Sequence, residues 1–246
     1  MKRFSIAVVT LAAAGALLVV ACGGRSAKRA GLPPEDSLYL PLPEDTVNKG
    51  TLSQSLCVSG TTAHQAIETW VNEHNDAIQS QIALIKLMMK VSARQLQKEG
   101  EFEYTVENGG RTLTLHALVQ ADDSIAYDAT FNGPNITDYK FLDGTTAADK
   151  NSGAWTFHKQ DGSDVVHVTW MRDGDDLTVE RDRLDLGRHV SYTRVATAVT
   201  VVFTGPNHNA TAHWDTETRD GDIQIESAIE ICWEYDGTQY CDVACP

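Results

Sequence analysis

The chain has 246 residues, of which 42% are hydrophobic, 22% charged and 7% aromatic, a composition typical of a folded globular protein rather than a disordered or fibrous one. Its 34 acidic residues outnumber its 20 basic residues, so the formal net charge is −14. Because nucleic-acid binding needs clustered lysine and arginine against the phosphates, this balance argues against a nucleic-acid partner.

The N-terminus has the pattern of an export signal. A basic start at Lys2 and Arg3 is followed by an apolar run over residues 6–20 and by a small residue before Cys22. The apolar run is shorter than the roughly 20 residues that a bilayer-spanning helix needs, and the whole pattern is that of a secretory signal peptide. We therefore expect residues 1–21 to be removed. The signal holds two basic and no acidic residues, so its loss takes the net charge from −14 to −16.

The junction Val19-Val20-Ala21-Cys22 resembles the lipobox of bacterial lipoproteins. The resemblance implies that Cys22 becomes the mature N-terminus and carries acyl chains, palmitate among them, that anchor the chain in a membrane. In that family an aspartate after the cysteine favours the inner membrane; Gly23 stands there instead, which implies the outer membrane, facing the periplasm. The alternatives are an ordinary signal peptide that has a cysteine near its end, or a short anchor helix.

A tether and one domain are predicted to follow. Residues 22–50 contain two glycines and four prolines without a sustained hydrophobic period, which indicates a lipidated linker. As a flexible coil, the 28 residues after the cysteine would span about 30 Å. Residues 51–246 are expected to form a single domain.

A long amphipathic helix is predicted at the start of this domain. Thr62 and Gln65 have the spacing of a capping box, apolar residues then repeat every three or four positions, and Gly100 marks the end. An unbroken helix over 63–99 would be about 55 Å long, whereas a domain of this size is about 42 Å across. We therefore expect the helix to break in the polar run 72–76.

After Gly100 the hydrophobic period changes from 3.6 to 2, and turn dipeptides ending in glycine recur. This pattern predicts 11 to 13 short strands in a long antiparallel meander, hence a β-rich α+β fold in which the helix packs on a half-barrel, a barrel or a sandwich. The crossovers of a nucleotide-binding fold are absent. The turn dipeptides are Asn108-Gly109, Asn132-Gly133, Asp143-Gly144, Asp161-Gly162, Asp173-Gly174, Asp220-Gly221 and Asp236-Gly237.

Four cysteines remain besides the one expected to be lipidated, and an even number in an exported chain favours two disulfides. A two-residue hairpin loop at 236–237 would place Cys232 opposite Cys241, at a distance that a disulfide can bridge. Cys57 and Cys245 would then form the second bond. A four-cysteine zinc site is the alternative, but the sequence has no C-x-x-C pair.

No motif of catalysis or metal binding stands out. The sequence lacks G-x-S-x-G, S-x-x-K, a phosphate-binding glycine loop and H-E-x-x-H, and the acidic turn at 173–176 lacks the spacing of a calcium loop. We therefore expect no metal, no cofactor and no enzymatic activity. A hydrolase of an unrecognised type is the least favoured alternative.

These observations predict a non-catalytic, membrane-anchored lipoprotein of the bacterial cell envelope that binds a hydrophobic molecule between helix and sheet. The expected arrangement is similar to that of periplasmic lipoprotein carriers, although no motif is shared. The alternatives are a structural or assembly role, with the acidic surface binding another envelope protein, and a helix–sheet interface filled by its own side chains. The residues expected to line a ligand cleft are Leu84, Met88, Met89, Trp155, Phe157 and Trp170.

Overall fold

Antiparallel strands dominate the computed structural model, as the sequence predicts. The helices are α1 (Glu35–Leu38) and α2 (Thr62–Met88). The strands are β1 (Arg94–Gln95), β2 (Glu101–Asn108), β3 (Arg111–Val119), β4 (Ile125–Gly133), β5 (Ile136–Thr146), β6 (Ser152–His158), β7 (Asp164–Asp173), β8 (Asp176–Arg183), β9 (Arg188–Val195), β10 (Ala198–Thr204), β11 (Asn209–Asp215), β12 (Gly221–Ile225), β13 (Ile229–Tyr235) and β14 (Tyr240–Val243). The structure describes residues 33–40, 62–88, 94–95, 100–206, 209–226, 229–235 and 240–245.

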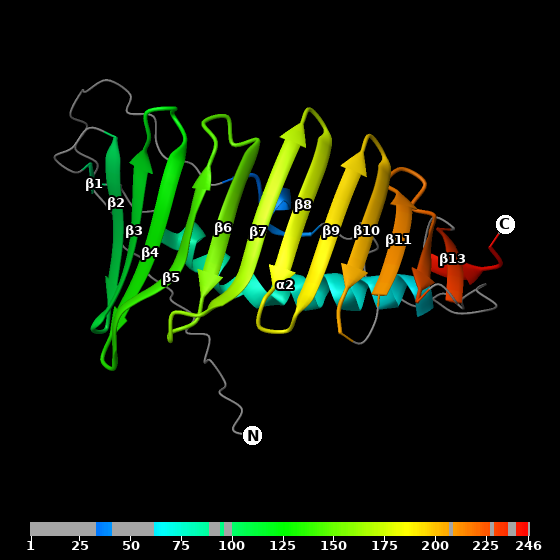
Figure 1. The fold of residues 1–246 in the computed structure, drawn as a ribbon, viewed down its shortest axis with the longest axis horizontal. Helices are drawn as coiled ribbons and strands as arrows, with labels where there is room; N and C mark the ends of the chain where they lie inside the picture. Colours follow the sequence, from blue (N-terminus) through cyan, green and yellow to red (C-terminus); the bar gives the residue numbers. More distant parts are fainter. Residues whose placement is uncertain are drawn as a thin grey trace, which may run out of the picture.

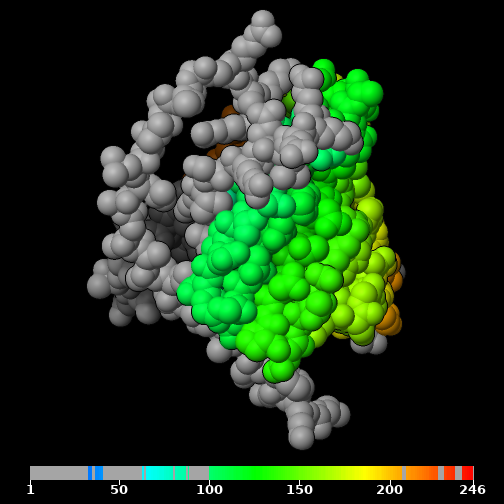
Figure 2. Space-filling view, turned by 90° about the vertical axis from the view of Figure 1, so that its left-hand side faces the viewer, coloured from blue at the N-terminus to red at the C-terminus, as the bar shows by residue number. Residues whose placement is uncertain are grey.

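The described strands lie side by side in chain order, from β1 at one edge to β14 at the other, and each pairs antiparallel with the next (Figure 1). Seen from the β1 end, the sheet recedes from the green strands to the yellow and orange ones, so the long axis of the molecule runs across the strands (Figure 2). The predicted β-rich class is confirmed. Within the described residues the strands form one open sheet, neither closed into a barrel nor divided into two layers.

The inner face of the sheet carries the core because the strands alternate buried and solvent-facing side chains. In β8 the alternation buries Leu177, Val179 and Arg181, and in β6 it buries Trp155 and Phe157. These positions follow the period of two by which successive side chains of a strand point to opposite faces.

One predicted turn is wrong. Asp143 and Gly144 lie inside β5, where they pair with Thr156 and Trp155 of β6. A Cβ atom on Gly144 would overlap the backbone and the ring of Trp155. The glycine is therefore explained by close packing of an aromatic ring and not by a tight turn.

Helix α2 runs behind the sheet and across its strands (Figure 1). Its 27 residues correspond to about 40 Å. The helix is continuous through residues 72–76, so the predicted break is wrong, and it cannot reach residue 99 because β1 begins at Arg94. Near its N-terminus, the amide of Ala63 donates a hydrogen bond of 3.2 Å to Oδ1 of Asp242 in β14. In the described part of the chain, no helix is both long and apolar enough to cross a membrane.

A segment from within the predicted tether belongs to the core. Residues 33–40, called the docked segment below, include α1 and contact β7 and β8. Leu38 and Leu40 are 1% and 2% exposed. The tether prediction overlooked this segment because eight residues with two prolines show no period, whereas their burial depends on a groove that the rest of the chain builds.

The disulfide prediction also needs correction. Cys232 bonds to Cys245, with their Cα atoms 5.1 Å apart, and Cys241 is disulfide-bonded as well. The predicted partner was wrong because Tyr235 pairs with Tyr240, which leaves four residues between the paired ends and not two. This register shifts β14 and places Cys241 opposite Glu234. Cys57 lies outside the described residues.

Candidate functional site

The residues predicted to line a ligand cleft are mostly core residues. Trp155, Phe157 and Trp170 come together on the inner face of β6 and β7, with ring centroids 6.2 Å apart for the two tryptophans. All three are at most 3% exposed, and Met88 is fully buried as well. Leu84, by contrast, is 36% exposed and points away from this cluster's interior. Met89 lies outside the described residues.

These aromatic rings are held by their neighbours. The indole of Trp155 donates to the hydroxyl of Thr146 at 3.3 Å, and that of Trp170 donates to the carbonyl of Lys150 at 3.3 Å. Gly153 leaves room for the ring of Trp170, since a Cβ there would overlap it. Close packing and satisfied N–H groups identify this cluster as structural.

A second feature lies where the polar run of α2 meets β8 and β9. Three arginines, Arg181, Arg183 and Arg188, face the helix there and are called the arginine cluster below. Nη1 of Arg183 donates to the carbonyl of Glu73 at 3.2 Å, and Nη1 of Arg188 lies 2.7 Å from Oε2 of the same glutamate. These contacts explain why the polar run stays helical: its side chains and carbonyls find partners on the sheet.

Arg181 is the most buried member of the cluster, with no exposed surface. Its guanidinium donates to Oδ1 of Asn75 at 3.1 Å and to the carbonyl of Leu38, while its Nε has no partner among the described residues. No carboxylate contacts it within that part of the chain, and burial lowers its pKa to about 9. A buried charge with only neutral partners is costly, because they do not restore its lost hydration.

Asn75 joins α2 to the docked segment. Its Oδ1 accepts a hydrogen bond from the amide of Leu40 at 2.9 Å, and its Nδ2 donates to the carbonyl of Leu40 at 3.0 Å. The same oxygen also accepts from Arg181. One amide side chain therefore connects the helix, the sheet and the docked segment.

His74, next to Asn75, is buried and neutral at physiological pH. It is 4% exposed, and its Nδ1 has no hydrogen-bond partner among the described residues. Burial, followed by the positive charges of the arginine cluster, lowers its pKa from 6.5 to about 3. His74 therefore contributes a neutral imidazole with an unused nitrogen.

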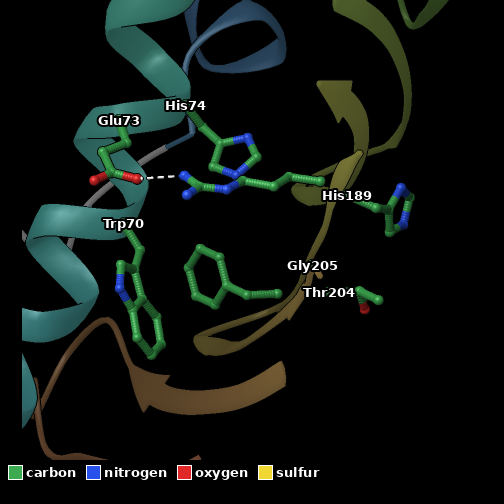
Figure 3. A pocket seen from close by; sticks show the side chains of 8 residues that line it. Trp70, Glu73, His74, His189, Thr204 and Gly205 are labelled. Atoms are coloured by element: carbon green, nitrogen blue, oxygen red, sulfur yellow. Dashed lines mark hydrogen bonds and ion pairs between the residues drawn. The ribbon is translucent and has the colours of Figure 1, made fainter. Parts of the chain in front are cut away.

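These groups surround an open recess of about 290 Å³, counting the solvent at its mouth. Figure 3 shows Trp70, Glu73 and His74 reaching from α2 toward the strands. On the sheet side the recess meets Arg188 and Phe203. The other lining residues are His189, Thr204 and Gly205. We call this feature the recess below.

The sequence contained a partial signal for this site. In β8, residues 177, 179 and 181 alternate with polar residues, so period two already places Arg181 on the inner face. An arginine at a core position is unusual and marks a place to examine. The partners on α2 and in the docked segment have no such signal, because they lie more than 100 positions earlier in the chain.

Potential metal ligands gather at one place in the described part of the chain, where Glu230 lies close to Cys232 and Cys245. Both cysteines are joined in the disulfide and offer no thiolate. Histidines on the outer face contact carboxylates instead; His189, for example, lies 2.8 Å from Asp182. These arrangements do not favour a metal at either place.

Comparison with protein-family models, with curated proteins and with solved structures found no match.

Proposed function

We propose that the chain is a membrane-anchored, non-catalytic lipoprotein of the bacterial cell envelope, on the outer membrane and facing the periplasm, whose folded domain binds a ligand. The anchor is the acylated Cys22 that the lipobox pattern implies. The ligand site is the recess between α2 and the ends of β9 and β10. In this proposal a hydrophobic ligand enters at the rim of the helix–sheet interface, because the residues first expected to line a cleft are packed against one another.

One observation carries this proposal: the docked segment belongs to the core. Only eleven positions separate Cys22 from Pro33, where the described chain begins. Eleven residues cannot span more than about 40 Å, and as a flexible coil they would average about 18 Å. An anchor at Cys22 would therefore hold the domain close to the membrane surface, whereas the predicted 28-residue tether would have let it move farther away.

The membrane anchor is testable by replacing the acylated residue. The full chain, expressed in a bacterium with an outer membrane, is expected to incorporate an alkyne-tagged palmitate and to stay with the membrane after a high-salt wash. Cys22→Ala is expected to lose the label and enter the soluble fraction, because one thiol carries the acyl group. Metabolic labelling followed by fractionation measures both effects.

The matched control is Cys57→Ala, which removes another cysteine of the same chain and should keep the label. A Cys22→Ala chain that remained labelled and membrane-bound would disprove the anchor.

A second candidate function, binding of another envelope protein, is favoured by two leucines in the turn between β8 and β9. Leu184 and Leu186 are 52% and 43% exposed and immediately precede Arg188 of the recess. Exposed apolar side chains beside an arginine and a tryptophan are typical of protein-binding surfaces.

A photo-crosslinking residue at Leu186 tests this second function. If the turn contacts an envelope protein, a discrete crosslinked band is expected in intact cells. Val195, which is 55% exposed in the turn at the opposite end of β9, provides the matched control and should give no such band. Equal crosslinking from both positions, or from neither, would contradict a specific interface at Leu186.

A further inference from the structure

The recess has an apolar side and a polar side. Trp70 and Phe203 pack edge to face, with ring centroids 5.3 Å apart and planes at 66°. The imidazole of His74 lies on the other side of Phe203, with its centroid 6.4 Å away, and Arg188 completes the lining. A ligand held here would meet aromatic rings and polar nitrogens at the same time.

The unused nitrogen of His74 indicates where a polar ligand atom would bind. Nδ1 of this 4%-exposed residue has no partner among the described residues. Buried polar atoms in folded proteins nearly always have a hydrogen-bond partner, because leaving one unpaired costs free energy. His74 lines the recess, so a group placed there is within reach of its ring.

The local charge favours an anion although the whole chain is acidic. Arg183 and Arg188 pair directly across β8 and β9, and Arg181 lies one inner-face position before Arg183. Like charges opposite each other in a sheet repel. Glu73 and Asp185 offset part of this repulsion, at 2.7 Å from Arg188 and 3.1 Å from Arg183. The neutral Arg181 contacts leave its charge without an anion in this part of the chain.

Glu73 shows which anion the geometry suits. Its carboxylate contacts Arg188 at the edge of the recess, yet the side chain is 50% exposed. A half-exposed carboxylate loses little by turning into water, since surface ion pairs contribute little stability. A carboxylate brought by a ligand could therefore take the place of Glu73 on the guanidinium.

We propose that the recess binds small apolar carboxylates, with the carboxylate accepting hydrogen bonds from Arg188 and from Nδ1–H of His74 while the apolar body packs on Trp70 and Phe203. This inference rests on the proposed binding function and names its ligand class. The volume of about 290 Å³ is at the lower limit of pockets for drug-sized molecules, so one ring or a short chain fits.

The test is a ¹⁹F NMR titration of the full chain in lipid nanodiscs with 4-fluorobenzoate. Saturable line broadening is expected. The neutral 4-fluorobenzamide is expected to bind about tenfold more weakly, because a charge-assisted hydrogen bond is about twice as strong as a neutral one. Inorganic phosphate, an anion without an apolar body, is expected not to displace the benzoate.

Two variants with opposite expected effects locate the binding site. Arg188→Gln is expected to weaken benzoate binding at least about tenfold because it removes the cation. Glu73→Gln is expected to strengthen binding by about fivefold because it removes the internal competitor for that cation. Glu107→Gln, on the exposed end of β2, makes the same change of net charge and should leave affinity unchanged.

Three outcomes would overturn the proposal: no saturable binding, equal binding of benzoate and benzamide, or equal effects of Glu73→Gln and Glu107→Gln. A gain of affinity cannot arise from misfolding, so the Glu73 variant keeps the test decisive if Arg188→Gln folds poorly. Palmitate labelling of Cys22 is measured separately, so a membrane-anchored chain that ignores benzoate would refute the ligand class and leave the anchor standing.

Discussion

Replacing Asn75 with alanine is expected to destabilise the fold by about 3 kcal/mol and to release the docked segment. The change removes both hydrogen bonds to the backbone of Leu40 and the acceptor for Nη1 of Arg181. Each buried group that loses its partner costs about 1–3 kcal/mol, and water entering the gap recovers part of the loss. Urea unfolding followed by circular dichroism measures the free energy of unfolding, and hydrogen exchange at the amide of Leu40 reports release of the segment.

Asn72→Ala is the matched control for this prediction. Asn72 lies one turn earlier on α2, and its side chain makes no hydrogen bond within the described residues. Both variants replace asparagine with a better helix former, so differences in helix propensity cancel. We expect Asn72→Ala to change stability by less than about 0.5 kcal/mol. Similar losses in the two variants would show that Asn75 does not hold the docked segment.

The stability of the fold is expected to fall between pH 7 and pH 3 because of His74. Its pKa is 6.5 in the unfolded chain and about 3 in the fold, so only the unfolded state binds the proton in this range. Protons taken up by the unfolded state favour unfolding, and stability therefore decreases as pH falls through 6.5 toward 3. The linkage amounts to about 2 kcal/mol between pH 7 and pH 5, and to about 4 kcal/mol by pH 3.

His74→Phe isolates this contribution. Phenylalanine keeps a ring beside Phe203 and cannot titrate, so the variant is expected to lose about 2 kcal/mol less than the wild type between pH 7 and pH 5. Urea unfolding at both pH values measures the difference. His213→Gln, which changes an exposed histidine beside Asp222, should retain the wild-type dependence. Parallel pH profiles for wild type and His74→Phe would mean that His74 is protonated in the folded protein.

The meander was predictable because its signals are local. Period two assigns successive side chains to opposite faces, and glycine after asparagine or aspartate supplies the backbone conformation of a tight turn, as at Gly109 and Gly174. Gly144 has the same dipeptide context but lies within β5 under the ring of Trp155. Composition alone does not distinguish a turn glycine from one required by a neighbouring side chain.

The continuity of α2 was not predictable from its own residues. An isolated polar run such as 72–76 lacks an apolar face, and the estimated domain diameter argued for a break. The open sheet is wider than that estimate assumed, because its strands extend side by side instead of closing into a compact barrel. Arg183 and Arg188 then provide partners for Glu73 that stabilise the helix at this point.

By itself, the sequence determined the β-rich class, the antiparallel order of the strands, most turns and the burial of Trp155, Phe157 and Trp170, since each follows from short-range periodicity and turn chemistry. Only the tertiary structure decided the open form of the sheet, the Cys232–Cys245 bond and the docking of residues 33–40. It also brought Trp70 and His74 to Arg188 and Phe203. These contacts join residues more than 100 positions apart, and their free energies depend on burial and charge that exist only once the chain has folded.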